Sequence, residues 1–195
     1  YHISFHNPQI LFESFKKEYD NLEWNYDEEN FKKWCDGKTG FPIVDAGMRQ
    51  LKKEGWVHNR VRMITAMFLT KDLFIDWRLG EKFFAENLID LDFASNNGGW
   101  QWSASTGVDA QPYFRIFNPY LQSKKFDPDG DYIRKYLPEL KFLPDEFIHE
   151  PHNMSSADQQ KYKVLIGKDY PSPIVDHKTA KEFVLKKFKE LKEVN

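Results

Sequence analysis

The sequence predicts an all-α fold, a multi-helical bundle, from three observations. Apolar residues recur at helical spacing through most of the 195 residues. No run alternates between apolar and polar residues for long enough to indicate a sheet. The length is typical of one domain, and an aromatic fraction of 16% supplies bulky side chains for a single core.

The expected helices follow from their end residues and apolar faces. Pro42 suits the first turn of a helix and Gly55 suits its end, which predicts a helix over 43–54. The following helices are expected at 60–74, 79–89, 131–136 and 178–194. Proline-rich stretches at 144–151 and 171–173 indicate irregular connections. Because Tyr1 and Phe5 look like the middle of a helix, we expect the chain to be a piece of a longer one.

Composition excludes several classes of function. Cys35 is the only cysteine, so neither an intramolecular disulfide nor a thiolate metal cluster can form, and no metal site is predicted. No apolar run approaches the roughly 20 residues that span a bilayer, and we expect a soluble intracellular protein, cytoplasmic or nuclear, without membrane contact. A net charge of -2 argues against a nucleic-acid coat protein, although residues 46–71 are locally basic. For the lysines at 52 and 53, a solvated helix face is the favoured interpretation.

The segment DLDFASNNGGWQW, residues 90–102, combines two carboxylates, two amides, two glycines and two indoles. Adjacent glycines let the backbone approach a flat object closely, while the carboxylates and amides offer hydrogen bonds of defined direction. A planar ligand with a hydrogen-bonding edge fits this set. The alternative is a helix-capping turn followed by two core tryptophans, and the segment alone leaves both open.

A second segment, WVHNRVRM at 56–63, stands at the head of an apolar helix. Together with the segment above and with FRIFNP at 114–119, it resembles the flavin-binding region of the photolyase and cryptochrome family. The similarity runs from about Trp24 to about His177. It is greatest to photolyases that repair cyclobutane pyrimidine dimers, because Asn59 and Met63 differ from what six-four photolyases and DASH-type cryptochromes carry there.

The resemblance implies a light-driven carbon–carbon lyase whose active cofactor is reduced FAD. It implies that Asp90 and Asp92 bind the flavin and its ribityl neighbourhood, that Arg62 pairs with Asp90 beside the ring, and that Asn96 faces flavin N5. Many plant cryptochromes carry aspartate at that last position, so the asparagine favours a photolyase. A buried structural ion pair is the alternative for Arg62 and Asp90.

The resemblance also implies a site for DNA that contains a pyrimidine dimer, since photolyases flip their target out of the duplex. Trp102 matches the indole wall for the flipped dimer, and Met63 matches the apolar contact beside it. Asn59 and Arg60 match the polar pair that meets substrate and DNA, and Gln122 matches a further DNA contact. Core packing is the alternative for Trp102.

Three tryptophans match the chain that passes electrons to the flavin. The resemblance places Trp100 nearest the flavin, Trp77 in the middle and Trp24 at the surface. Without it, each is an ordinary core or boundary residue. His149 and His152 have a possible metal spacing, but we predict that both are structural.

Relatives carry an N-terminal antenna domain, where a second chromophore of unknown identity is expected, and an earlier part of the FAD-binding domain. We therefore expect residues 1–195 to be the C-terminal part of that domain, monomeric, and unable to hold FAD tightly alone. Two rivals stay open: a cryptochrome-type flavin photoreceptor without repair activity, and a flavin-free helical domain that binds nucleic acid.

Overall fold

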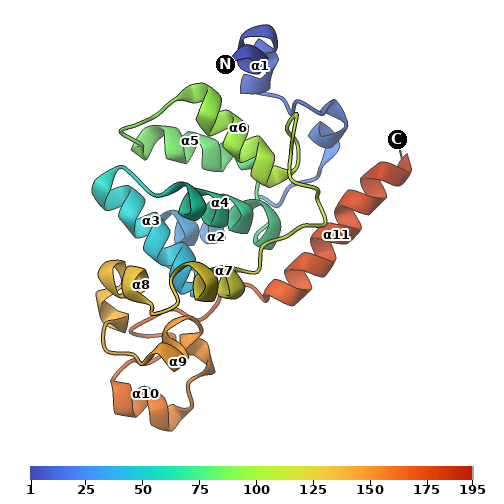
Figure 1. Cartoon of the computed structure of the whole chain (residues 1–195). Helices are drawn as coiled ribbons and strands as arrows, with labels where there is room; N and C mark the ends of the chain where they lie inside the picture. Colours follow the sequence, from blue (N-terminus) through green and yellow to red (C-terminus); the bar gives the residue numbers. More distant parts are fainter. Residues whose placement is uncertain (195) are drawn as a thin grey trace. The chain divides into compact units, whose positions relative to one another are not determined.

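The computed structural model describes residues 1–194 and consists of helices joined by short connections (Figure 1). Within these residues the only β-type pairings are isolated bridges, so the all-α prediction is confirmed. None of these helices has both the length and the apolar composition needed to cross a bilayer. The α-helices are α1 (His2–His6), α2 (Glu28–Cys35), α3 (Pro42–Glu54), α4 (Asn59–Met67), α5 (Trp77–Asn87), α6 (Phe93–Ala104), α7 (Pro119–Phe126), α8 (Asp131–Tyr136), α9 (Asp145–Ile148), α10 (Ser156–Tyr162) and α11 (His177–Val194).

Shorter turns of helix complete the chain. The 3-10 turns are η1 (Pro8–Leu11), η2 (Lys17–Asn21), η4 (Pro138–Leu140) and η5 (Pro151–Asn153), and η3 (Phe68–Asp72) is a π-helical turn. The stretch 144–151, expected to be irregular, contains α9 and the start of η5.

Helices with clear end residues match their predicted ranges. The predictions at 43–54, 79–89, 131–136 and 178–194 correspond to α3, α5, α8 and α11. Gly55 ends α3 with a φ of 65°, in the left-handed region that glycine adopts without strain. The single helix predicted at 60–74 is wrong, because α4 ends at Met67 and the chain continues as the π turn.

The chain divides into two compact units, which are described separately. Unit 1 contains Tyr1–Asp27, Ala66–Ile116 and the residues from Asp176 onward. Unit 2 contains Glu28–Thr65 and Phe117–Val175.

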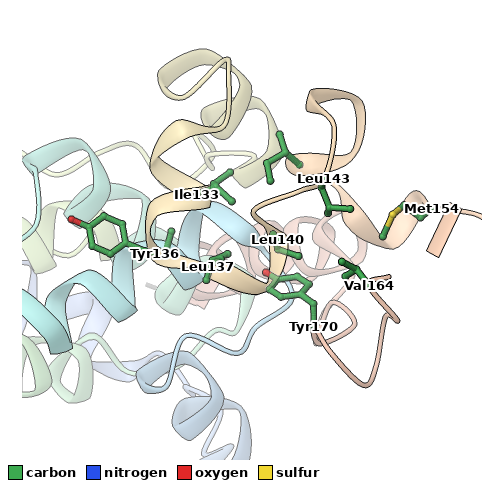
Figure 2. Packing of buried hydrophobic residues seen from close by; sticks show 10 residues of the cluster. Ile133, Tyr136, Leu137, Leu140, Leu143, Met154, Val164 and Tyr170 are labelled. Carbon is green, nitrogen blue, oxygen red and sulfur yellow. The ribbon is translucent and has the colours of Figure 1, made fainter. Parts of the chain in front are cut away.

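Unit 2 is built around α3, which packs against α2, α7 and α8. Beside α3, apolar side chains from α8 and the segments that follow it form one buried cluster, and Figure 2 shows Leu140, Val164 and Tyr170 converging there. Burial of such side chains is the main favourable term in folding. The buried members are Ala46, Ile133, Tyr136, Leu137, Leu140, Leu143, Ile148, Met154, Val164 and Tyr170.

A fully buried carboxylate, Asp45 on α3, ties this cluster to the loop before the helix. Its Oδ1 accepts hydrogen bonds from the backbone N–H of Thr39 at 2.7 Å and from the Thr39 hydroxyl at 2.6 Å. Its Oδ2 accepts from the N–H of Gly40 at 3.0 Å and from the Tyr170 hydroxyl at 2.6 Å. Burial raises the pKa of the Asp45 carboxyl, and these donors oppose that effect. One side chain thus joins segments 125 positions apart.

Substitution Asp45→Ala is expected to destabilise unit 2 by at least about 3 kcal/mol, because several buried donors lose their only acceptor. Urea denaturation measures the effect. Ser155→Ala, which removes the exposed cap of α10, is the control and should cost about 1 kcal/mol. Equal losses for the two variants would contradict the role given to Asp45.

In unit 1, helices α5 and α6 lie side by side (Figure 1). Trp100 on α6 lies against Gly80 on α5, where an added Cβ would stand 2.2 Å from the indole ring. Phe84, one turn further along α5, meets the Trp100 ring edge-to-face at 5.1 Å between centroids. The absence of a side chain at residue 80 therefore allows the two helices to approach.

The π turn η3 buries two adjacent ionisable residues of unit 1. Lys71 donates a hydrogen bond to the carbonyl oxygen of Ala104 at 3.0 Å, and its Nζ lies 3.9 Å from the ring centroid of Phe188. Asp72 contacts Nδ1 of His177, the first residue of α11, at 2.5 Å through Oδ1. Burial lowers the pKa of Lys71. The turn thereby connects α4 with both the end of α6 and the start of α11.

Asp72 is expected to make the stability of the protein fall between about pH 4 and pH 6. Burial raises the pKa of its carboxyl from 3.8 to about 6, and the hydrogen bond to His177 opposes part of that shift. In this window the folded state keeps a proton that the unfolded state has released, so raising the pH favours unfolding by about 3 kcal/mol. Urea denaturation from pH 4 to pH 8 should show this trend in the wild type and not in Asp72→Asn. Parallel pH profiles would contradict it.

Candidate functional site

Helix α6 is held in unit 1 by its first residues and by one buried face. Asp92 caps the helix, accepting from the N–H of Ser95 at 2.8 Å, and the Tyr1 hydroxyl donates to it at 2.6 Å. These two bonds lower the pKa of the Asp92 carboxyl. Asn97 and Gln101 are buried, and both donate side-chain N–H groups to the carbonyl of Ile10. These contacts fix which side of α6 faces outward.

Asn96, predicted to face a flavin, is oriented by a residue that sequence reasoning missed. Its Nδ2 donates to the backbone oxygen of Glu81 at 3.1 Å and to Oε1 of the same residue at 2.9 Å. Burial raises the pKa of Glu81, and the amide opposes that shift. Because both donors are used, Oδ1 of Asn96 is left as an acceptor. No sequence pattern marks Glu81, because its contact with Asn96, 15 residues further along the chain, depends on how two helices pack.

Gly98 and Gly99 border open space. A Cβ built on either glycine would meet no atom within 4 Å, so packing among the described residues does not require glycine there. Glycine in a helix interior costs about 1 kcal/mol relative to alanine. The pair is therefore not explained by packing, and it leaves the exposed surface of α6 without side chains at these two positions.

Trp102 lines a cavity of about 170 Å³ in unit 1, one turn along α6 from Gly98. The cavity wall is mostly apolar, and the indole is half-buried. A space with a flat aromatic wall suits a planar ligand. The remaining lining residues are Ile3, Ile10, Phe15, Asn97, Gly98, Gln101, Gly107, Val108, Asp109 and Ala110.

The three tryptophans of the expected electron chain all lie in unit 1 and are all buried. Trp100 and Trp77 stand on the packed helices α6 and α5. Trp24 was expected at the surface, and that expectation is wrong, because the side chain is only 6% exposed. Phe74 covers it at 4.9 Å between ring centroids, and Asn25 holds the segment by donating to the carbonyl of Phe74. The indole nitrogens of Trp24 and Trp77 are buried and have no hydrogen-bond partner among residues 1–194.

Unit 2 contains the other predicted residues, most of them at the start of α4. Asn59 and Met63, one turn apart, contact each other through Nδ2 and Sδ at 3.6 Å. Arg62 donates from Nε to the carbonyl of Val57 at 2.8 Å. The guanidinium of Arg60 lies over aromatic rings instead of a carboxylate. Gln122 is on α7, and its Oε1 is shielded from solvent and has no hydrogen-bond partner in the described part of the chain.

Some expectations join the two units and stay predictions. The pairing of Arg62 with Asp90 is one of them, since Asp90 lies in unit 1.

His149 has a structural role in unit 2, with Nδ1 at 2.7 Å from the Ser123 hydroxyl and Nε2 at 3.2 Å from the carbonyl of Pro128. Among residues 1–194 no group of three or more histidines, cysteines or carboxylates is placed to hold a metal ion.

Comparison with known proteins identifies the family. Residues 1–190 match the family model described as the FAD binding domain of DNA photolyase. The chain belongs to this photolyase family. It is 57% identical over 187 residues to a deoxyribodipyrimidine photo-lyase of Alkalihalophilus pseudofirmus, covering 96% of this chain and 39% of that protein. It is 52% identical over 179 residues to the Escherichia coli deoxyribodipyrimidine photo-lyase, covering 92% and 37% respectively.

Solved structures of photolyase family members agree. A bacterial class III photolyase from Agrobacterium tumefaciens superposes with a TM-score of 0.95 at 50% identity, over 98% of this chain and 40% of that one. A cryptochrome from Synechocystis gives a TM-score of 0.86 at 42% identity, over 91% and 37%. The chain thus spans less than half the length of these relatives. The family resemblance and the helical fold inferred from the sequence are confirmed.

Gly99→Ala is expected to raise the stability of the chain by about 0.5–1 kcal/mol, because alanine favours the helix and its Cβ meets nothing. If a flat cofactor lies against α6, the same change should weaken FAD binding by the full-length protein about tenfold, or about 1.4 kcal/mol. Thermal denaturation and FAD titration measure the two effects. Ser95→Ala, at an exposed position of the same helix, is the control and should leave FAD binding unchanged. Undiminished FAD binding by the glycine variant would contradict this placement.

Proposed function

We propose that this chain is the C-terminal part of the FAD-binding domain of a photolyase that splits cyclobutane pyrimidine dimers in DNA under light. The observation that carries the proposal is the match of residues 1–190 to the FAD binding domain of DNA photolyase, together with relatives of that name at about half identity. The α6 surface supports it independently, because an oriented amide, two unexplained glycines and an aromatic cavity wall lie along one helix.

The residues of α6 fit a flavin. Reduced FAD, when bound, supplies an electron on absorbing light. Asn96 offers an uncharged acceptor, Oδ1, whose direction is fixed by Glu81, and such a group suits a protonated ring nitrogen. Gly98 and Gly99 allow close approach of a ring. Asp92 and Asp90 stand at the entrance of the helix, where Asp92 also serves as the cap.

Contacts with the dimer and DNA are assigned in each unit by itself, to Trp102 in unit 1 and to the start of α4 in unit 2. Trp102 provides a flat wall at the cavity, and stacking of a base on such a ring contributes about 1–3 kcal/mol. Asn59 and Met63, already in mutual contact, present an amide and an apolar group on one face of α4. Arg60 supplies donors that no oxygen atom among residues 1–194 accepts, and together with Gln122 on α7 it is assigned to contact with DNA.

Trp100, Trp77 and Trp24 are assigned to electron transfer toward the cofactor. All three indoles are buried in unit 1, and Trp100 and Trp77 belong to packed helices. The unpartnered nitrogens of Trp77 and Trp24 leave those N–H groups without a neighbouring base among residues 1–194. Aromatic rings in a dry interior are suited to passing an electron onward.

The deciding experiment uses the full-length protein, reduced chemically and illuminated with a duplex that contains one thymine dimer. Repair is followed by recovery of the ultraviolet absorbance of thymine. Light-dependent recovery is expected for the wild type. Trp100→Phe should abolish light-driven reduction of the oxidised cofactor and leave repair by the chemically reduced protein unchanged.

Trp56→Phe is the matched control for that variant, because Trp56 is an exposed indole of unit 2, and it should retain both activities. Bound flavin without any repair would instead favour a photoreceptor, and a protein that binds DNA without flavin would favour a helical binding domain. Loss of both activities in Trp100→Phe would contradict the electron-transfer role.

A further inference from the structure

Arg60 differs from the arginines that unit 2 neutralises internally. Arg49 pairs with Glu139 at 2.7 Å, and Arg134 pairs with Asp145 at 2.6 Å. Within residues 1–194, no oxygen atom accepts a hydrogen bond from the guanidinium of Arg60. Its Cζ lies 4.4 Å from the ring centroid of Phe126 and 5.9 Å from that of Phe117. The rings hold the guanidinium while its N–H donors stay unused.

A second cation shares the Phe126 ring. The Nζ of Lys125 lies 5.4 Å from the same centroid, and Lys125 has no carboxylate partner in the described part of the chain. The preceding residue, Lys124, is by contrast paired with Glu150 at 2.5 Å. Two unneutralised cations on one ring repel each other, and a bound anion offsets that repulsion.

Gln122 adds an independent observation on the same side of α7. It precedes Phe126 by one helical turn, so the two side chains are neighbours on the helix surface. Its Oε1 is shielded from solvent and accepts no hydrogen bond from residues 1–194. Gln122 therefore adds a further polar side chain next to the Phe126 ring.

We infer that Phe126 is a positioning residue for DNA binding, whose ring holds the Arg60 guanidinium and the Lys125 ammonium toward the phosphate backbone. The inference rests on the proposed function. Phe126 is 44% exposed, so its ring and the cations beside it can be reached from outside. Cation–aromatic contact orders a long side chain before binding, which reduces the entropy that binding must overcome.

The test is a double-substitution cycle on the full-length protein, with a dimer-containing duplex and its undamaged counterpart as probes. Phe126→Leu keeps apolar volume and removes the ring, and it should weaken DNA binding about two- to fivefold. Phe126→Tyr should restore wild-type affinity. In an Arg60→Gln, Lys125→Gln background, Phe126→Leu should have no further effect, because the cations on which it acts are gone.

Two further readouts separate positioning from a general structural role. The repair yield at saturating DNA should be unchanged in Phe126→Leu, with only the dissociation constant raised, and the thermal midpoint should stay at the wild-type value. Phe142→Leu is the matched control, since Phe142 is an exposed ring of unit 2 with a lysine 5.8 Å from its centroid, and it should leave DNA binding unchanged.

The outcomes are distinguishable. Wild-type protein that fails to bind either duplex overturns the proposed function and this inference with it. Normal wild-type binding with unchanged affinity in Phe126→Leu overturns this inference alone. An equal loss of affinity in the background that lacks both cations also overturns it, because the ring would then act by another route.

Discussion

Residue 80 has no side chain, and this permits the indole of Trp100 to lie directly against helix α5. The contact sets the rotation of α6 in unit 1: with Trp100 inward, Asn97 and Gln101 are also buried and reach the carbonyl of Ile10. Gly98 and Gly99 then face outward. Because Glu81 follows Gly80 directly, the same approach of the helices brings its carboxylate to Asn96. One missing Cβ therefore underlies both the packing of α6 and the orientation of the amide at its surface.

The charged side chains of unit 2 differ in whether hydrogen-bond donors or opposite charges within the unit stabilise them. Asp45 is buried with donors on both carboxylate oxygens, so its charge stabilises a loop and a helix together. Arg49 and Arg134 likewise have carboxylate partners. Arg60 is the contrasting case, since it is supported only by aromatic rings. A cation that the fold orders without neutralising it keeps its charge available for another molecule.

Residues that start or end a helix made part of the fold predictable from the sequence. Helix α8 has its predicted bounds because Gly130 precedes it and Pro138 limits it, and both act on the adjacent backbone. Helix α6 was not predicted as a helix, because Gly98 and Gly99 lower its propensity and its buried face carries polar side chains. That face is stabilised by hydrogen bonds to segments about 90 positions away, which periodicity cannot show.

The candidate site was likewise only partly predictable from the sequence. The residue types of the segment at 90–102 pointed to a planar ligand, the resemblance pointed to a flavin and DNA, and the match to the FAD binding domain of DNA photolyase agrees with it. Glu81 was missed because its relation to Asn96 depends on the packing of two helices. Trp24 was expected at the surface from the resemblance, and no local pattern indicates that Phe74 covers it. Side-chain chemistry could thus be read from the sequence, whereas burial and orientation depended on tertiary contacts.

The π turn at Phe68–Asp72 shifts the helical register of the chain. Its hydrogen bonds close five residues apart instead of four, so it accommodates one residue more than an α-helical turn does. That extra residue rotates the following side chains by about 100° relative to a continuous helix, and Lys71 and Asp72 thereby reach Ala104 and His177. Substitutions in this turn alter individual contacts, but losing one residue would turn both ionisable groups away from their partners together. The length of this segment therefore matters more to the placement of these two groups than any single side chain within it.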